Sequence, residues 1–135
     1  GITEQEVFTK ALGLYQKALK LDPHNFPLAT DIAQTYYGIK PTRTEDALKA
    51  WNYALSIAHD DVEREGVYIH LARFKLNAER FDEARKQLTL VTNPMYAELK
   101  SRLQRNIDAR EKAMKETNSA PATAKETNTV PAAPK

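Results

Sequence analysis

One helical pattern of small and large residues occurs twice in this chain, and the two copies lie 36 residues apart. The first copy consists of Ala11, Tyr15, Ala18 and Leu19, and the second of Ala47, Trp51, Ala54 and Leu55. A third, weaker copy consists of Ala84, Leu88 and Val91. Spacings of three and four residues place the members of each copy on one face of a helix. A helical face that recurs indicates helices packed against their own neighbours in a stack, so we expect an array of helical repeats.

The motif resembles the second helix of the tetratricopeptide repeat (TPR) family. The family pattern has an aromatic residue, Leu-Gly and Tyr in a first helix, then Ala, an aromatic residue, Ala and Pro in a second. Residues 11–23, which read ALGLYQKALKLDP, match the second half. Two later segments match the first half through Ala29, Ile32, Ala33 and Tyr36, and through Tyr68, Leu71 and Ala72. The chain departs from the pattern at His59, which replaces the final Pro, and at Lys75, which replaces the Tyr.

The resemblance implies an all-α fold, namely an α-solenoid of antiparallel helix pairs wound into a right-handed superhelix. We expect the repeat domain to occupy residues 1–116, as repeat units 1–25, 26–60 and 61–93 with a C-terminal capping helix 94–116. Ala18 and Ala54 are the expected close-approach positions, and Tyr15 and Trp51 fill the space beside them. Residues 117–135, rich in Lys, Thr, Pro and Ala, hold too few bulky apolar groups to fold, which predicts a disordered tail.

Capping residues mark the starts of the expected helices. The first two expected helices span residues 4–21 and 26–39. The third ends near residue 59, and the fourth begins at about residue 60. The fifth spans residues 81–92, and the sixth runs from residue 94 to about 115. Their expected N-caps are Thr3, Asn25, Thr42 or Thr44, Asp60 and Asn93. Four carboxylates lie at the start of the fourth expected helix, namely Asp60, Asp61, Glu63 and Glu65. Negative charge is favourable there because the helix dipole and the free N–H groups attract it, so we interpret the run as structural.

Composition excludes several classes of function. The 135 residues contain no Cys, which rules out disulfides, thiolate zinc sites and cysteine nucleophiles. Three His and four Gly form no metal-ligand pair, catalytic triad or phosphate loop, so we expect neither an enzyme nor a cofactor or metal site. There is no signal-peptide pattern in this piece and no apolar run of membrane-spanning length. We expect a soluble protein without membrane insertion, with the cytoplasm as the default compartment.

In the family that the chain resembles, the first helices of successive repeats line a concave groove that holds a peptide or a partner helix. Carried over to this sequence, the groove residues are Asp31, Gln34 and Tyr37, together with His70, Arg73 and Asn77. Polar and aromatic side chains suit recognition of peptide backbone and charged ends. We expect Asp31 to hold Arg73 in place while the groove is empty. The alternative interpretation is that these residues are only the solvated faces of two amphipathic helices.

The sequence therefore favours a non-catalytic protein–protein interaction scaffold that binds a peptide or partner helix of unknown identity. One alternative is a structural or self-associating segment of a longer TPR protein. Another is an anion or nucleic-acid binder that uses the basic C-terminal helix with Lys100, Arg102, Arg105, Arg110 and Lys112. Three acidic residues, Glu98, Asp108 and Glu111, interrupt that basic run. A nucleic-acid surface would be more purely basic, which disfavours nucleic acid as the partner.

Overall fold

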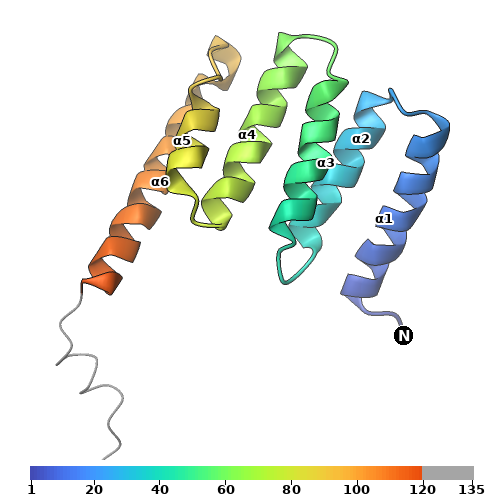
Figure 1. Cartoon of the computed structure of the whole chain (residues 1–135), viewed down its shortest axis with the longest axis horizontal. Helices are drawn as coiled ribbons and strands as arrows, with labels where there is room; N and C mark the ends of the chain where they lie inside the picture. Colours follow the sequence, from blue (N-terminus) through green and yellow to red (C-terminus); the bar gives the residue numbers. More distant parts are fainter. Residues whose placement is uncertain (120–135) are drawn as a thin grey trace, which may run out of the picture.

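The computed structural model describes residues 1–119, and this part of the chain is all-helical, as predicted. Its six α-helices are α1 (Glu4–Leu21), α2 (Phe26–Thr35), α3 (Thr44–Ser56), α4 (Asp61–Asn77), α5 (Phe81–Leu88) and α6 (Ala97–Asn118). Two short 3-10 helices, η1 (Tyr36–Gly38) and η2 (Pro94–Tyr96), precede the third and sixth of them. Each helix packs against the next one in the chain, and Figure 1 shows them in a row from α1 to α6.

The α4 helix lies at the centre of this row because it is apolar on two sides. Val67, Leu71 and Phe74 belong to a first core cluster, which α4 shares with α1, α2 and α3. Ile69, Ala72 and Leu76 belong to a second cluster, which α4 shares with α5 and α6. An amphipathic helix with one apolar stripe could serve only one of these cores. The two-sided pattern therefore places α4 between the two halves of the molecule.

The two strong copies of the repeated motif are buried to different extents. In the second copy, Ala47, Trp51 and Ala54 are 0%, 1% and 0% exposed. In the first copy, Tyr15 is 37% exposed, so the prediction that it fills a buried groove is wrong. The reason is position in the row, because α3 lies between α2 and α4, whereas α1 packs mainly against α2. Tyr15 shares the inner face of α1 with Leu12 and Leu19, but this face packs mainly against the single helix α2, so part of the Tyr15 side chain stays exposed.

Four of the predicted N-caps are confirmed. Side-chain oxygens of Thr3, Asn25, Asp60 and Asn93 accept hydrogen bonds from backbone N–H groups in the first turn that follows each of them. The cap predicted for the third helix is wrong, because α3 begins at Thr44 after Arg43, whose side chain makes no capping bond. Arg43 instead forms an ion pair with Asp46 in the first turn of α3. That turn already carries the negative charge that a helix N-terminus favours.

The α-helical part of the second helix ends at Thr35 rather than at residue 39, and the η1 turn completes it. Close packing against α1 explains the change of path. A Cβ atom on Gly38 would lie 2.3 Å from the ring of Phe8, so only glycine fits there. Gln5 then clamps the following backbone, since its amide donates to Gly38 O at 3.1 Å and accepts from Lys40 N–H at 2.8 Å. Tertiary contacts with α1 thus determine where the second helix stops.

The fifth helix ends at Leu88, four residues before the predicted end at residue 92. A glutamate on α4 binds the backbone N–H groups of the residues that would otherwise have continued α5. Glu65 is 8% exposed, and its Oε1 accepts hydrogen bonds from the N–H groups of Thr92 and Asn93 at 2.6 and 2.7 Å. Glu65 therefore joins α4 to the turn before α6. From the sequence alone, Glu65 was interpreted only as one of the acidic residues at the start of the fourth helix.

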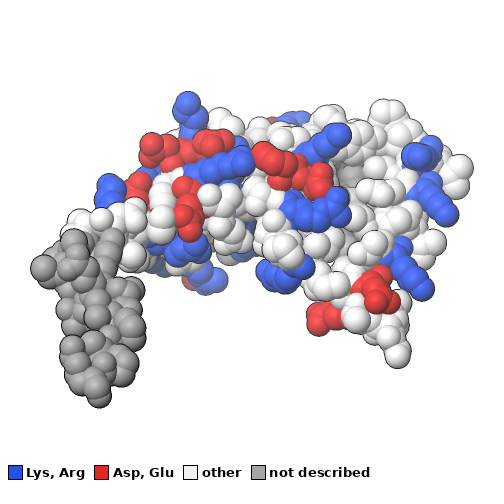
Figure 2. Space-filling model, turned by 60° about the horizontal axis from the view of Figure 1, so that its bottom comes forward, with Lys and Arg blue, Asp and Glu red and all other residues white. Residues whose placement is uncertain are grey.

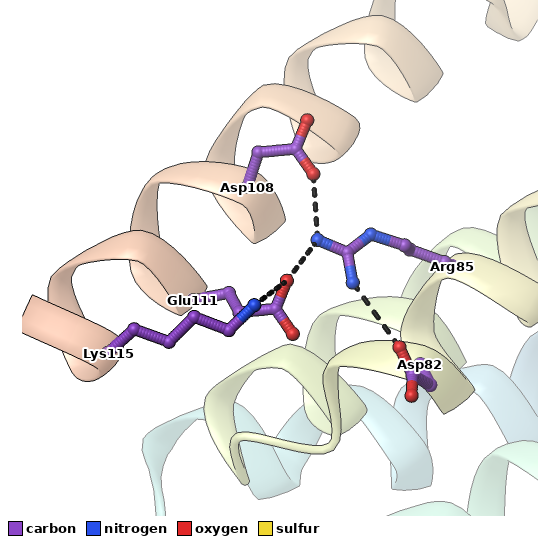
Figure 3. A network of polar contacts seen from close by, with 5 residues as sticks. All are labelled: Asp82, Arg85, Asp108, Glu111 and Lys115. Carbon is purple, nitrogen blue, oxygen red and sulfur yellow. Dashed lines mark hydrogen bonds and ion pairs between the residues drawn. The ribbon is translucent and has the colours of Figure 1, made fainter. Parts of the chain in front are cut away.

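The α6 helix packs against the second core through Leu103 and Ile107. An ion network fixes its far half to α5 (Figure 3). One nitrogen of Arg85 lies 2.8 Å from both Asp108 and Glu111, and this hydrogen bonding lowers the pKa of Glu111. The helix runs to Asn118, slightly beyond the expected end. Residues 120–135 of the predicted tail lie outside the described residues.

We predict that Trp51→Ala lowers the free energy of unfolding by about 3–5 kcal/mol, because it removes a large side chain from a closely packed site. Urea titration followed by circular dichroism measures this loss. The exposed neighbour Asn52 provides the control, and Asn52→Ala should change stability by less than about 0.5 kcal/mol. A loss below about 1 kcal/mol for Trp51→Ala would contradict the central place of this residue in the core.

Candidate binding groove

A pocket of about 280 Å³ lies between α2 and α4, where the sequence analysis expected a groove. Its walls come from three helices and from η2. The lining residues are Phe26, Thr30, Gln34, Trp51, Val62, Glu63, Gly66, Val67, His70 and Tyr96. Gln34 and His70 belong to the predicted set, and the other residues were not predicted as site residues. We call the surface that contains this pocket and the residues that continue it along α4 the groove.

Helical spacing explains how two segments far apart in the sequence form one surface. On the α2 side the groove residues are Phe26, Thr30, Gln34 and Tyr37, three or four positions apart. On the α4 side they are Gly66, His70, Arg73 and Asn77, again three or four positions apart. Each set occupies one face of its helix. The neighbouring faces of α2 and α4 are buried in the first core, so these rows are left at its edge.

Aromatic contacts hold the two rows in register. Near the start of α2, Phe26 lies edge-on to His59, with ring centroids 6.4 Å apart. Just beyond the end of α2, the Tyr37 hydroxyl lies 2.7 Å from Nδ1 of His70. The two rows therefore run in the same order along the groove. The Tyr37 ring also contacts Phe74, at a centroid distance of 4.5 Å, which anchors the hydrogen-bonded pair to the core.

His70 is the most constrained residue of the groove. Its ring stacks on Trp51 with centroids 4.0 Å apart and planes inclined by only 6°. Burial, with a smaller contribution from the charge of Arg73, lowers the pKa of His70 to about 4. The ring is therefore neutral near pH 7, and its Nδ1 can accept a hydrogen bond from the Tyr37 hydroxyl. Burial also raises the pKa of Tyr37, and this keeps the hydroxyl protonated as the donor.

The six predicted residues lie in different situations. Gln34 and His70 line the pocket, and Tyr37 bonds to His70. Arg73 is half-buried one turn beyond His70 and close enough to influence the pKa of both His70 and Tyr37. Asn77 is exposed in the last turn of α4. His70, Arg73 and Asn77 thus form one row along α4, and Gln34 and Tyr37 lie on the α2 side of the groove.

Asp31 is the exception among the predicted residues. It is exposed, it does not line the pocket, and it lies next to Thr30 on the outer side of α2. None of the ion pairs found within residues 1–119 joins Asp31 to Arg73, so the prediction that Asp31 holds Arg73 in place is wrong. Helical geometry explains this, because a shift of one residue turns a side chain by about 100° around the axis.

Two lining residues could not have been assigned from the sequence patterns. Trp51 was interpreted as core alone, yet it forms the floor of the pocket beneath His70, and its Nε1 is buried without a hydrogen-bond partner in the described part of the chain. Tyr96 comes from η2, and its hydroxyl donates to the Val62 carbonyl at 2.9 Å. Gly66 could have been predicted as a groove residue from the sequence, because it lies in the same helical row as His70 and Arg73.

The two ends of the groove differ in charge. Glu63 lies at the pocket end, where its carboxylate accepts the backbone N–H of His59 at 2.7 Å. Arg73 lies towards the other end, and none of the ion pairs found in the described residues includes it. A half-buried guanidinium without a carboxylate partner has donors available for an external acceptor. The arrangement is suited to recognition of a ligand with an acidic group.

A larger hollow of about 620 Å³ lies away from the groove, between α1, the turn after it, and α3. Leu19 and Tyr53 form part of its wall, and the Tyr53 hydroxyl is used in a hydrogen bond to the Pro23 carbonyl. The remaining polar groups around it are mainly the ends of exposed side chains such as Lys17 and Lys20. Fixed polar groups that converge on one point give a site its specificity, and the groove between α2 and α4 provides more of them.

Comparison with protein-family models, curated proteins and solved structures finds no match to this chain. The TPR resemblance therefore stays a prediction that rests on the residues themselves. Among the helices of residues 1–119, none combines the length and apolarity needed to cross a membrane. The same residues contain no cluster of three or more His, Cys, Asp or Glu arranged to hold a metal ion.

We predict that the wild-type protein loses stability relative to His70→Gln as the pH falls through the range between 6.5 and about 4. Over this range the unfolded chain binds more protons than the folded one, because the pKa of His70 is lower in the folded state, so acid favours unfolding. We expect a relative loss of about 1–3 kcal/mol, reduced from the full linkage value because the ring is partly solvated.

Urea titrations of both proteins at neutral and acidic pH measure this difference, and the carboxylates common to both cancel in the comparison. A second variant, Tyr37→Phe, removes the hydroxyl that bonds to His70 but keeps the titrating ring, so it should retain the acid sensitivity. If the stability difference between wild type and His70→Gln is the same at both pH values, His70 is not held neutral by its surroundings.

Proposed function

We propose that this chain is a TPR-like α-solenoid of antiparallel helix pairs and that it acts as a non-catalytic scaffold. Its partner is a protein or peptide segment held in the groove between α2 and α4. One observation carries the proposal, namely that Arg73 stands half-buried and without an ion pair in the described residues, beside a pocket with fixed polar groups. A partly desolvated cation without a carboxylate partner is costly, and a binding partner that supplies the missing negative charge would offset this cost.

The internal repeat supports the solenoid part of the proposal. Ala33 in α2 and Ala47 in α3 are both fully buried, and so are Ala72 in α4 and Ala84 in α5. Small residues at these paired positions let the axes of consecutive helices approach closely. Buried alanines thus occur both between α2 and α3 and between α4 and α5, as expected when one structural unit is repeated and stacked.

Peptide recognition fits the chemistry of the groove better than catalysis does. His70, the residue most able to transfer protons, is neutral, stacked on Trp51 and hydrogen-bonded to Tyr37. A ring held in this way is positioned as part of a wall. The amide of Gln34 and the guanidinium of Arg73 offer donors and an acceptor that suit peptide carbonyls, N–H groups and carboxylates. These groups can bind an extended chain without any chemical step.

We predict that Arg73→Ala weakens peptide binding by about 1–3 kcal/mol, because the change removes a charge-assisted contact. This corresponds to roughly 5- to 150-fold in Kd. Ligands are first selected from a displayed random-peptide library on the wild-type protein, and titration calorimetry then measures their affinities for each variant. Circular dichroism should show unchanged helical content, since Arg73 is not part of either core cluster.

The matched control is Arg105→Ala on α6, an exposed arginine far along the chain from the groove. It should leave peptide affinity unchanged. If Arg105→Ala abolishes binding of the selected peptides and Arg73→Ala does not, the groove is not the binding site and the basic-helix alternative takes its place.

A second candidate function, self-association, is favoured by the uncovered face of α1. Val7, Leu14 and Leu21 recur every seven residues along this helix and are 48%, 67% and 89% exposed. In the second repeat, the positions that correspond to Leu14 and Leu21 hold Ala50 and Ile57, and both of these pack partly buried against the first core. We propose that in this case α1 packs against α1 of a second copy of the chain, because an apolar helical stripe is stabilised when another helix removes it from water.

Under this second proposal, Leu14→Lys should shift the chain from dimer to monomer in sedimentation equilibrium, because it places a charge in the middle of the apolar stripe. Gln16→Lys adds the same charge on a neighbouring exposed position and should leave the dimer intact. A wild-type chain that sediments as a monomer over a wide concentration range would rule out self-association through α1.

The third alternative, binding of anions or nucleic acid by α6, receives less support from the contacts. Lys100 donates to the Val91 carbonyl at 2.8 Å, Arg102 lies 3.7 Å from Glu98, and Arg110 lies 4.0 Å from Glu79. Figure 2 shows Lys and Arg interleaved with Asp and Glu over the face that it presents. A phosphate backbone favours a clustered positive surface, and interleaved carboxylates oppose it.

A further inference from the structure

We propose that the groove selects an extended segment in which a large apolar side chain and an acidic side chain lie three residues apart. The inference rests on the proposed function and names the class of partner for the same groove. The apolar side chain enters the pocket beside Gly66, and the carboxylate pairs with Arg73. The argument uses the composition of the two halves of the groove and the distance between them.

The half of the groove around Gly66 is mainly apolar and of side-chain size. Phe26, Val62 and Tyr96 surround the position where Gly66 lacks a side chain. A Cβ atom placed on Gly66 would lie 3.1 Å from the Tyr96 hydroxyl, so Tyr96 packs closely over this glycine and forms part of the pocket wall. The volume of about 280 Å³ lies just below the range typical of pockets for whole small-molecule ligands. A single large apolar side chain is therefore the occupant that this half fits.

The half of the groove around Arg73 is suited to a carboxylate. Arg73 is half-buried beside Tyr37, and such surroundings strengthen a charge pair relative to one in water. His70 is neutral and already bonded to Tyr37, so it does not repel a cation or compete for the carboxylate. Planar guanidinium and carboxylate groups can form two parallel hydrogen bonds, which adds directional selectivity.

The distance between the two halves determines the spacing in the ligand. Gly66 and Arg73 are seven residues apart on one helix. At a rise of about 1.5 Å per residue their positions are separated by roughly 10 Å along the axis. A peptide in the extended polyproline II conformation advances about 3.1 Å per residue with three residues per turn, so two side chains three residues apart lie roughly 9 Å apart on the same side of the chain. A partner with the two side chains adjacent to each other cannot reach both sites at once.

The charge of Glu63 adds a second element of selection. Its carboxylate lines the pocket end of the groove and is held there by the backbone N–H and the ring of His59. An acidic residue next to the apolar side chain of a ligand would meet this like charge. The groove therefore disfavours acidic residues at the pocket end and favours them at the Arg73 end, so it distinguishes the position of the charge as well as its presence.

Fluorescence anisotropy with labelled synthetic peptides tests the inference. The reference peptide has about nine residues, with Phe and Asp three positions apart in a Ser/Gly background. We expect the same peptide with Asn in place of Asp, and the one with Phe and Asp adjacent, to bind at least roughly tenfold more weakly. Peptides with the order of Phe and Asp reversed test both chain directions. Equal affinities across the whole set would overturn the inference.

Variants of the protein locate the two contacts. Arg73→Glu should lose the reference peptide and bind a peptide with Lys in place of Asp, because the charges are then exchanged. Gly66→Leu fills the pocket from α4 and Thr30→Phe fills it from α2, and either should block binding, whereas Ser101→Leu on the exposed side of α6 should not. Two filling variants from different helices keep the test decisive if one of them fails to fold.

The outcome separates the inference from the proposed function. If library-selected peptides bind and a filling variant blocks them, but they show no acidic residue at the predicted spacing, the inference is wrong and the groove function stands. If no selected or designed peptide binds the folded wild-type protein, the proposed function fails and the inference fails with it. If Gly66→Leu blocks binding but Arg73→Glu does not bind the peptide with Lys in place of Asp, the acidic part of the inference is wrong.

Discussion

The two-sided burial of α4 is the constraint on which the rest of the structure depends. Val67, Leu71 and Phe74 face one core, and Ile69, Ala72 and Leu76 face the other. The first three helices and the last two would otherwise form small separate cores, and small cores bury too little apolar surface to be stable. Because α4 contributes to both, a disturbance at its packing face weakens both halves of the chain together.

The same constraint creates the groove. Most of the circumference of α4 is occupied by its two cores, so its remaining strip, from Gly66 through His70 and Arg73 to Asn77, is left at the surface beside α2. The stack of His70 on Trp51 closes the floor under this strip and holds the imidazole neutral. Polar groups on a strip supported in this way are fixed by the packing beneath them, so a ligand would meet a preorganised surface.

The sequence by itself was sufficient for the helices and for much of their order. Capping by Thr3, Asn25, Asp60 and Asn93 depends on local hydrogen bonds, and the structure has all four. The Ala-x-x-x-Trp-x-x-Ala pattern in α3 identified a buried helix face because spacing along a helix translates directly into direction. Four members of the predicted groove set, Gln34, Tyr37, His70 and Arg73, were placed near one another by the same reasoning.

Only the tertiary structure decided which residues the side chains of each sequence pattern contact. Tyr15 and Trp51 occupy the same place in the motif, yet one is exposed and the other buried, because the number of neighbouring helices differs. The pairing of Glu65 with the N–H groups of Thr92 and Asn93 ends α5 through a contact 27 and 28 residues away. For the same reason Asp31, which was expected in the groove, lies outside the pocket, whereas Tyr96 lines the pocket without having been predicted to do so. Local spacing fixes the direction of a side chain from its own helix, whereas its partners depend on where the other helices pack.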